Sequence, residues 1–184
     1  PGQAGAPSGL TYQAGVSKVG STDFGKADVY LPGHFIWEAK RAQKTADARA
    51  RKLGDALAQA SLYAYELGNP PLMIVTDFVE IRVHTVFTAT APRMYRITLD
   101  DIEHNRKLEA TDLTTLQVLN AAFHRPELLN PARQRQEMTT QATAQVGEVA
   151  QSMVRRGLGQ REVSHFLMRL VFAMFAEDVG LLDD

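Results

Sequence analysis

The feature that most constrains the fold is the pair Pro32-Gly33, which lies between two short segments with strand character. Proline presets φ at the second position of a turn, and glycine supplies the positive φ that a type II turn requires at the next. Residues 27–31 precede the turn. Residues 34–39 follow it and contain aromatic and β-branched side chains that favour strands. The sequence therefore predicts a β-hairpin.

One helix and two further strands are expected after this hairpin. Residues 46–67 are rich in alanine and leucine, form an apolar stripe with helical spacing, and are followed by Gly68 as a C-terminal cap. Residues 72–75 form the short apolar run of a buried strand, and residues 80–84 alternate between apolar and polar. With a weak extended segment over residues 10–18, the pattern predicts an α/β fold, a small mixed sheet with flanking helices.

Beyond residue 98 the pattern becomes helical. We interpret this part as an all-α region, and we interpret the apolar stripe 166–175 as a core helix whose width indicates a second packing partner outside this chain. The expected helices cover residues 100–108, 113–124, 133–156 and 160–179.

The composition excludes several classes of protein. The chain has 184 residues and a hydrophobic fraction of 45%, which is ordinary for a globular protein. Cysteine is absent, which excludes disulfides, thiolate zinc sites and a cysteine nucleophile, and fits the cytoplasm. No segment is long and apolar enough for a membrane span, and no secretory signal is visible, so no membrane partner is expected.

The net charge of −1 is unlike that of a DNA-packaging protein, which would be strongly basic. Any contact with DNA must therefore come from a local patch. Arg41 and Lys44 are candidate contacts to a DNA backbone, although such a run by itself also describes a solvated helix face. The basic segment, whose only acid is Asp47, consists of Lys40, Arg41, Lys44, Arg49, Arg51 and Lys52.

The candidate catalytic residues are Asp28, Glu38 and Lys40. Glu38 and Lys40 are two apart on one expected strand and so share a face, and the hairpin turn folds Asp28 back beside them. Two adjacent carboxylates bind a hard divalent cation such as Mg²⁺, and the backbone carbonyl of Ala39 could add a ligand. A lysine beside the metal can orient or deprotonate water while the metal polarises a phosphate. The triplet alone also describes a hairpin with exposed charges.

In context the triplet resembles the PD-(D/E)xK nuclease superfamily, in particular members with a Gln-x-x-x-Tyr motif on the following helix. Gln59 and Tyr63 match that motif and are spaced to share one helix face. The resemblance implies that they help to place the DNA backbone or the catalytic carboxylates. The alternative is an ordinary amphipathic helix with Tyr63 partly in the core.

Over nearly all of residues 10–184 the chain is similar to MmeI-type restriction–modification enzymes, most specifically in residues 27–40 and 166–182. In that family an N-terminal nuclease domain is joined by a helical connector to an adenine-specific DNA methyltransferase and a target-recognition domain. The resemblance implies a nuclease domain over residues 10–98 and a connector over residues 99–184.

Residues 1–9 are interpreted as linker or disordered, and the helix that usually precedes the first strand in such nuclease domains is missing. Both ends of the chain look cut, so we expect a fragment of a longer enzyme. Its partners would be duplex DNA and the rest of the same polypeptide. S-adenosylmethionine would bind only in the methyltransferase part, outside this chain.

One motif points elsewhere. Asn69-Pro70-Pro71-Leu72 resembles the Asn-Pro-Pro-aromatic motif of adenine methyltransferases, but Leu72 replaces the aromatic residue and no glycine-rich cofactor loop precedes it. We interpret it as a turn that stops the helix. The histidines, at positions 34, 84, 104, 124 and 165, show no metal-ligand spacing.

The expected function is Mg²⁺-dependent hydrolysis of phosphodiester bonds in duplex DNA. Two alternatives remain open at this point. One is a catalytically inactive DNA-binding or scaffold module of the same fold. The other is a helical interaction module in which residues 100–184 are the functional part.

Overall fold

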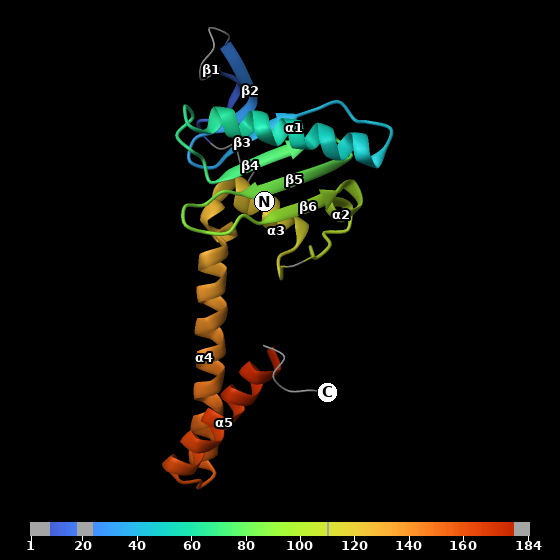
Figure 1. The fold of residues 1–184 in the computed structure, drawn as a ribbon. Coiled ribbons are helices and arrows are strands. Elements are labelled where there is room, and N and C mark those ends of the chain that lie inside the picture. The colour runs from blue at the N-terminus through green and yellow to red at the C-terminus, as the bar shows by residue number, and fades with distance from the viewer. Residues whose placement is uncertain (1–7, 18–23, 110, 179–184) are drawn as a thin grey trace, which may run out of the picture. The chain divides into compact units, whose positions relative to one another are not determined.

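A computed structural model of the chain describes residues 8–17, 24–109 and 111–178. The expected fold class is confirmed, because one mixed sheet is flanked by helices and a helical region follows it (Figure 1). Most of the segment interpreted as a linker, residues 1–7, lies outside the described residues. The strands are β1 (Thr11–Ser17), β2 (Phe24–Leu31), β3 (Phe35–Ala39), β4 (Leu72–Thr76), β5 (Glu80–Thr85) and β6 (Met94–Thr98).

The six strands lie side by side in the order of the sequence. All neighbours are antiparallel except β3 and β4, which are parallel. The hairpin between β2 and β3 is confirmed, since His34 N donates to the carbonyl of Leu31 at 3.0 Å and Gly33 has φ +71°. A parallel pair needs a crossover connection, which α1 (Ala46–Ala64) provides.

The two ends of α1 are fixed by local chemistry. Thr45 is the N-cap, and its side chain accepts a hydrogen bond from Ala48 N. After the last helical turn Gly68 adopts φ +75°, and Asn69 N donates to the carbonyl of Ala64 at 2.7 Å, the pattern of a Schellman cap. The segment Asn69-Pro70-Pro71 is therefore the helix-stopping turn that we predicted from the sequence.

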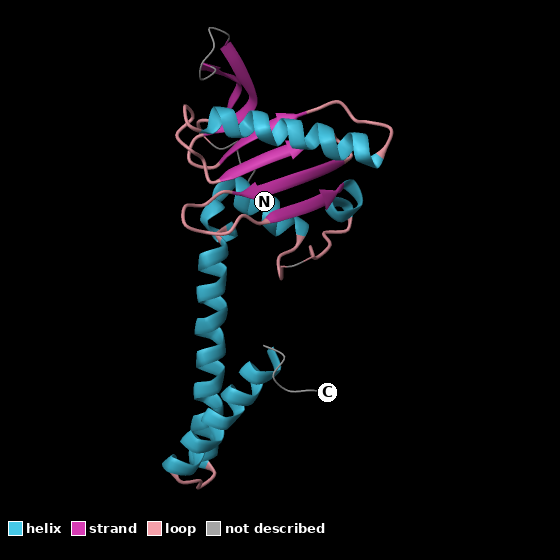
Figure 2. Ribbon diagram, in the orientation of Figure 1, coloured by secondary structure: helices cyan, strands magenta, loops and turns pink. Residues whose placement is uncertain are grey.

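Helices cover both faces of the sheet, so each face has its own apolar core (Figure 2). On one face α1 packs Leu53, Ala56 and Ala60 against β3 and β4. The other face is covered by α2 (Leu99–Glu103), α3 (Thr115–His124) and the 3-10 helix η1 (Pro126–Leu129). Successive side chains of β3 point alternately to the two faces of the sheet, and this alternation sets the position of the candidate site.

The predicted helix over residues 100–108 is confirmed at its start but wrong at its end, because α2 ends at Glu103. Asn105 adopts the left-handed conformation with φ +46°, and Arg106 N donates to the carbonyl of Asp101 at 3.0 Å. These are the features of a Schellman cap, for which asparagine is the usual substitute for glycine. The helical spacing of the residues beyond does not overcome this local stop.

The compact unit that contains the sheet extends to Gln134, well beyond residue 98, where the helical pattern begins. The reason is that α3 buries Val118, Ala121 and Ala122 against the sheet. Helical periodicity shows that a helix has an apolar face, but it does not show what that face packs against.

The second compact unit, residues 135–184, contains most of α4 (Pro131–Arg155) and all of α5 (Gln160–Asp178). The interpretation of the stripe 166–175 as a core helix is wrong, since its large side chains are exposed, among them Phe172 at 69%. In the part of the chain that the structure describes, no helix is both long and apolar enough to cross a membrane.

Replacing Phe35 should test the packing of the sheet against α3. Its ring is fully buried and makes edge contacts with Trp37 and Phe123, at centroid separations of 6.1 and 5.0 Å. We expect Phe35→Ala to lower the free energy of unfolding by about 3–5 kcal/mol, measured by urea denaturation. The matched control is Phe78→Ala, because Phe78 is 71% exposed, and the expected change is within about 0.5 kcal/mol. Equal losses in both variants would contradict this assignment of the core.

Candidate active site

Strand β2 leaves its neighbour β3 at Asp28, and this bend positions the first carboxylate. β2 pairs with β3 only through residues 29–31. Gln13, which stands opposite Asp28 in the register of β1 and β2, has the unusual φ of +50°. The Asp28 side chain accepts a hydrogen bond from Ala39 N at 2.8 Å. The carboxylate thus reaches the backbone of β3 next to Glu38.

Glu38 is the buried acid of the site, with only 1% of its side chain exposed. One carboxylate oxygen, Oε2, lies 3.5 Å from Lys40 Nζ, while the other, Oε1, is buried and has no hydrogen-bond partner. Burial and the negative charge of Asp28 raise the pKa of Glu38 to about 7, although Lys40 and the backbone of Asp28 oppose the shift. A buried, orphaned carboxylate oxygen beside a second acid is a position where a cation would be favourable.

Lys40 is held in place by α1. Its Nζ donates to Oε1 of Gln59 at 2.7 Å, and Nε2 of Gln59 donates in turn to the hydroxyl of Tyr63 at 3.0 Å. Tyr63 is buried in the core between α1 and the β1–β2 hairpin. The five residues singled out from the sequence, Asp28, Glu38, Lys40, Gln59 and Tyr63, therefore lie in one connected arrangement.

A turn after β4 braces the same end of the sheet, and the sequence analysis did not find it. Lys40 N donates to the carbonyl of Thr76 at 2.8 Å. The buried Asp77 pairs with Arg49 of α1 at 2.8 Å. Although burial alone would raise it, the backbone N–H groups of Glu80 and Val79 and the Arg49 guanidinium keep the pKa of Asp77 below its usual range. The only signal in the sequence was an acid placed directly after a buried strand.

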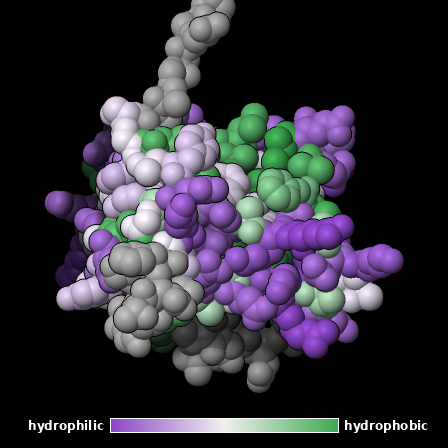
Figure 3. Space-filling view, turned by 90° about the horizontal axis from the view of Figure 1, so that it is seen from above, coloured by the Kyte–Doolittle hydropathy of each residue, from purple (hydrophilic) through white to green (hydrophobic). Residues whose placement is uncertain are grey.

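The remaining predicted contacts lie on the surface. Arg41 and Lys44 are exposed in the segment between β3 and α1. Seen from above, much of the surface is hydrophilic, and a group of apolar side chains lies at the upper right (Figure 3). The basic side chains of this segment are thus accessible to an anionic partner, but the geometry does not tie them to the carboxylates.

The donor set suits a hard divalent cation only in part. Within residues 8–17, 24–109 and 111–178 no group of three or more His, Cys, Asp or Glu side chains is placed to hold a metal ion. Asp28 and Glu38 supply two carboxylates, and the orphaned Oε1 of Glu38 fits a ligand role. Backbone carbonyl, water and substrate oxygens would have to complete the shell, which is common for Mg²⁺.

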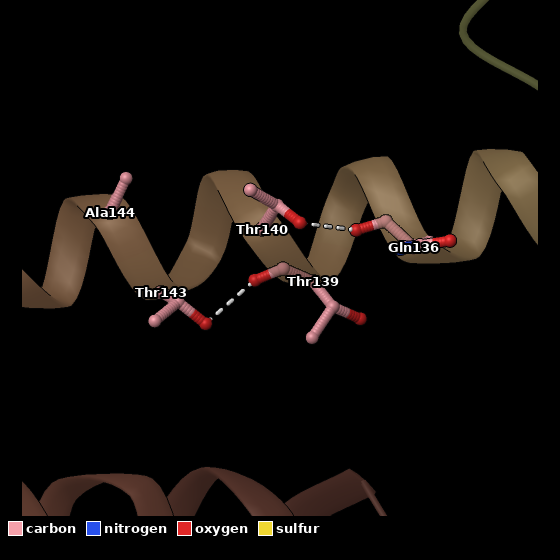
Figure 4. A pocket seen from close by; sticks show the side chains of 5 residues that line it. All are labelled: Gln136, Thr139, Thr140, Thr143 and Ala144. Atoms are coloured by element: carbon pink, nitrogen blue, oxygen red, sulfur yellow. Dashed lines mark hydrogen bonds between the residues drawn. The ribbon is translucent and has the colours of Figure 1, made fainter.

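A surface on α4 offers no comparable chemistry. It is lined by Gln136, Thr139, Thr140, Thr143 and Ala144 (Figure 4). The hydroxyls of Thr139, Thr140 and Thr143 each donate to a carbonyl one turn earlier in the same helix. The lining contains no charged group, so this surface is not a candidate site.

These features define a class of protein, an α/β domain that presents two acids and a lysine at one end of its sheet. Comparison with models of protein families matches residues 5–156 to the family described as MmeI, N-terminal domain. The chain belongs to this family, whose members are modules of restriction–modification enzymes. No curated protein and no solved structure gave a match.

The pKa of Glu38 predicts how the stability of the protein depends on pH without divalent cations. The folded state keeps a proton on Glu38 up to about pH 7, whereas the unfolded chain releases it near 4.5. The stabilisation of the fold by this proton is complete below the pKa of Glu38 in the unfolded chain. It decreases as the pH rises above that value and is lost as the pH rises through the folded-state pKa of about 7. Because Glu38→Gln cannot titrate, wild type should lose about 3 kcal/mol relative to the variant across this range.

Urea denaturation in a chelating buffer, at one pH below 4.5 and at one pH above 7, measures the difference. The matched control is Glu103→Gln, which alters an exposed glutamate of α2 and should follow wild type. Parallel stability curves for wild type and Glu38→Gln would show that Glu38 is not protonated in the folded state.

Proposed function

We propose that this chain is a Mg²⁺-dependent DNA-cleaving domain of a restriction–modification enzyme. The observation that carries the proposal is the state of Glu38. It is buried, one of its oxygens lacks a hydrogen-bond partner, a second acid approaches it, and a fixed lysine lies 3.5 Å away. A buried carboxylate with one unpartnered oxygen and a second acid nearby destabilises a fold, so a ligand that neutralises it is the simplest reason for its presence.

Asp28 and Glu38 would hold the cation, with the carbonyl of Ala39 as a further ligand. When bound, Mg²⁺ would polarise the scissile phosphate and make a nearby water more acidic. Cation binding and proton binding compete at Glu38, because the pKa of this acid is raised to about 7. The affinity for the cation should consequently increase with pH through that range.

Lys40 is the residue placed to act on the attacking water. Its Nζ has one contact to Glu38 and one to Gln59, which restrict its position. From there it would orient the water or, as a neutral amine, accept its proton, as the water oxygen forms a bond to phosphorus. One P–O ester bond then breaks and the leaving oxygen takes up a proton from solvent water, which leaves a phosphate monoester on one DNA end and a hydroxyl on the other.

The substrate would be duplex DNA. Arg41 and Lys44 are exposed in the segment between β3 and α1, so they can contact phosphates of the DNA backbone. The described residues contain no element that resembles a groove-reading motif, and we therefore assign sequence recognition to other parts of the same polypeptide. S-adenosylmethionine would likewise bind in a methyltransferase part outside this chain.

Removing Lys40 tests the catalytic role. In the enzyme that carries this domain, we expect Lys40→Ala and Asp28→Ala to lower DNA cleavage by at least about 10²-fold, because the water and the cation lose their positions. Adenine methylation should stay within about twofold, since it would use a separate site. Plasmid cleavage and methyl transfer, assayed on the same preparations, measure both effects.

Lys107→Ala provides the matched control, because Lys107 is an exposed lysine paired with Asp112 in the segment after α2. It should retain both activities. Loss of methylation together with cleavage in a folded Lys40→Ala protein would argue against two separate sites. Full cleavage by Lys40→Ala would refute the proposed role of the lysine.

DNA binding by the 184-residue chain alone should be weak and sensitive to salt. Its net charge of −1 gives little long-range attraction, and only a few phosphate contacts are available. We expect Kd on the order of 10⁻⁴ to 10⁻⁶ M at near-physiological salt, with Lys44→Ala reducing the salt dependence by about one counterion. Fluorescence anisotropy of a labelled duplex measures this, with Lys107→Ala as control. Nanomolar, sequence-specific binding would place recognition inside this chain.

A further inference from the structure

Gly25 of β2 lies directly against the ring of Tyr63. A Cβ atom at this position would come within 2.4 Å of the Tyr63 hydroxyl oxygen and within 2.6 and 2.7 Å of the ring atoms Cζ and Cε1. Contacts this short do not occur in folded proteins, so either the strand or the ring would have to move. Gly25 does not have the positive φ that favours glycine, which means that the requirement is for space alone.

The Tyr63 ring has little freedom to move aside. Only 3% of the residue is exposed, and it belongs to a buried apolar cluster formed by β1, β2, β3, β4 and α1. Interiors of this density transmit a displacement rather than absorb it. The surrounding buried residues are Ala14, Val16, Ala27, Ile36, Ala60, Ala64 and Met73.

The hydroxyl of Tyr63 is the far end of the arrangement that holds Lys40. It accepts a hydrogen bond from Nε2 of Gln59 at 3.0 Å, which leaves Oε1 of the same amide turned toward Lys40 Nζ at 2.7 Å. An amide can satisfy both contacts in only one orientation. If the hydroxyl moves, Gln59 loses the contact that fixes its orientation, and Lys40 loses its partner on α1.

We infer that Gly25 is a positioning residue for Lys40 that acts through Tyr63 and Gln59. The effect of Gly25 on catalysis rests on the proposed nuclease function, whereas its effect on the position of Gln59 does not. The absence of a side chain at position 25 of β2 leaves room for the Tyr63 ring in the position from which its hydroxyl meets Gln59 on the same helix. The same strand carries Asp28 three residues later, so one close contact fixes both the lysine and the first acid of the site.

The structural part is tested by NMR on the 184-residue chain. The side-chain NH₂ group of Gln59 donates to Tyr63, and we expect Gly25→Ala to shift both of its proton resonances toward those of a free amide. The matched control is Gly15→Ala on the neighbouring strand β1, where an added Cβ meets nothing within 4 Å, and it should leave these resonances unchanged. Unchanged Gln59 resonances in folded Gly25→Ala protein would overturn the inference.

The functional part is tested by kinetics in the enzyme that carries this domain. Gly25→Ala and Gln59→Ala should each lower the cleavage rate by about 10- to 100-fold, the effect of a misplaced catalytic group. Because both act on the same contact to Lys40, the double variant should be no slower than the slower single variant. If Gly25→Ala acted through an unrelated structural defect, the rate losses of the two single variants would multiply in the double variant. That result would overturn the inference.

The outcomes also separate this inference from the proposed function. If wild-type enzyme does not cleave DNA, the nuclease proposal fails, while the Gln59 resonances still decide whether Gly25 positions the amide. If wild type cleaves and Gly25→Ala cleaves equally well, only the role of Gly25 fails. Gly15→Ala should cleave like wild type in either case.

Discussion

The hydrogen bond from Ala39 N to the Asp28 carboxylate is the interaction on which the candidate site depends. Strand β2 pairs with β3 for three residues and then turns toward α1, which would leave part of the β3 edge without a partner. The side chain of Asp28 replaces the missing strand contact by accepting the hydrogen bond of the Ala39 N–H. The same bend brings the β1–β2 hairpin over α1 and places an acid beside Glu38. The fold and the candidate site therefore depend on the same local arrangement of β2 and β3.

This arrangement disfavours the ionised form of Glu38. Water is excluded from its carboxylate by α1 and the sheet, and the nearby charge of Asp28 further disfavours ionisation, so its pKa rises to about 7. The positive charge of Lys40 offsets this rise in the pKa of Glu38 only partly. Its Nζ lies 3.5 Å from the acid, because Gln59 holds it at the shorter distance of 2.7 Å. The lysine is thus held by the neutral amide of Gln59 as well as by the acid. Membership of the MmeI N-terminal domain family agrees with a role on DNA.

Much of this could be predicted from the sequence because it depends on neighbouring residues. The turn at Pro32-Gly33 sets the hairpin, and the period of two along β3 puts Glu38 and Lys40 on one face. The helical period puts Gln59 and Tyr63 on one side of α1. The end of α2 was predicted wrongly although Asn105 carried the signal, since an asparagine does not reveal its φ until the turn is formed.

The sequence by itself determined the β2–β3 hairpin, α1 and the first five strands in their order, because local propensity and periodicity act over a few residues; β6 was not predicted from it. It also supplied Asp28, Glu38 and Lys40 as candidates. Tertiary structure alone decided that α2 and α3 belong with the sheet, that Asp77 pairs with Arg49, and that Gly25 receives the ring of Tyr63. It also decided that the apolar side chains of α5 remain exposed. Each of these joins segments far apart in the chain, and their contact depends on how strands and helices pack, which no local pattern encodes.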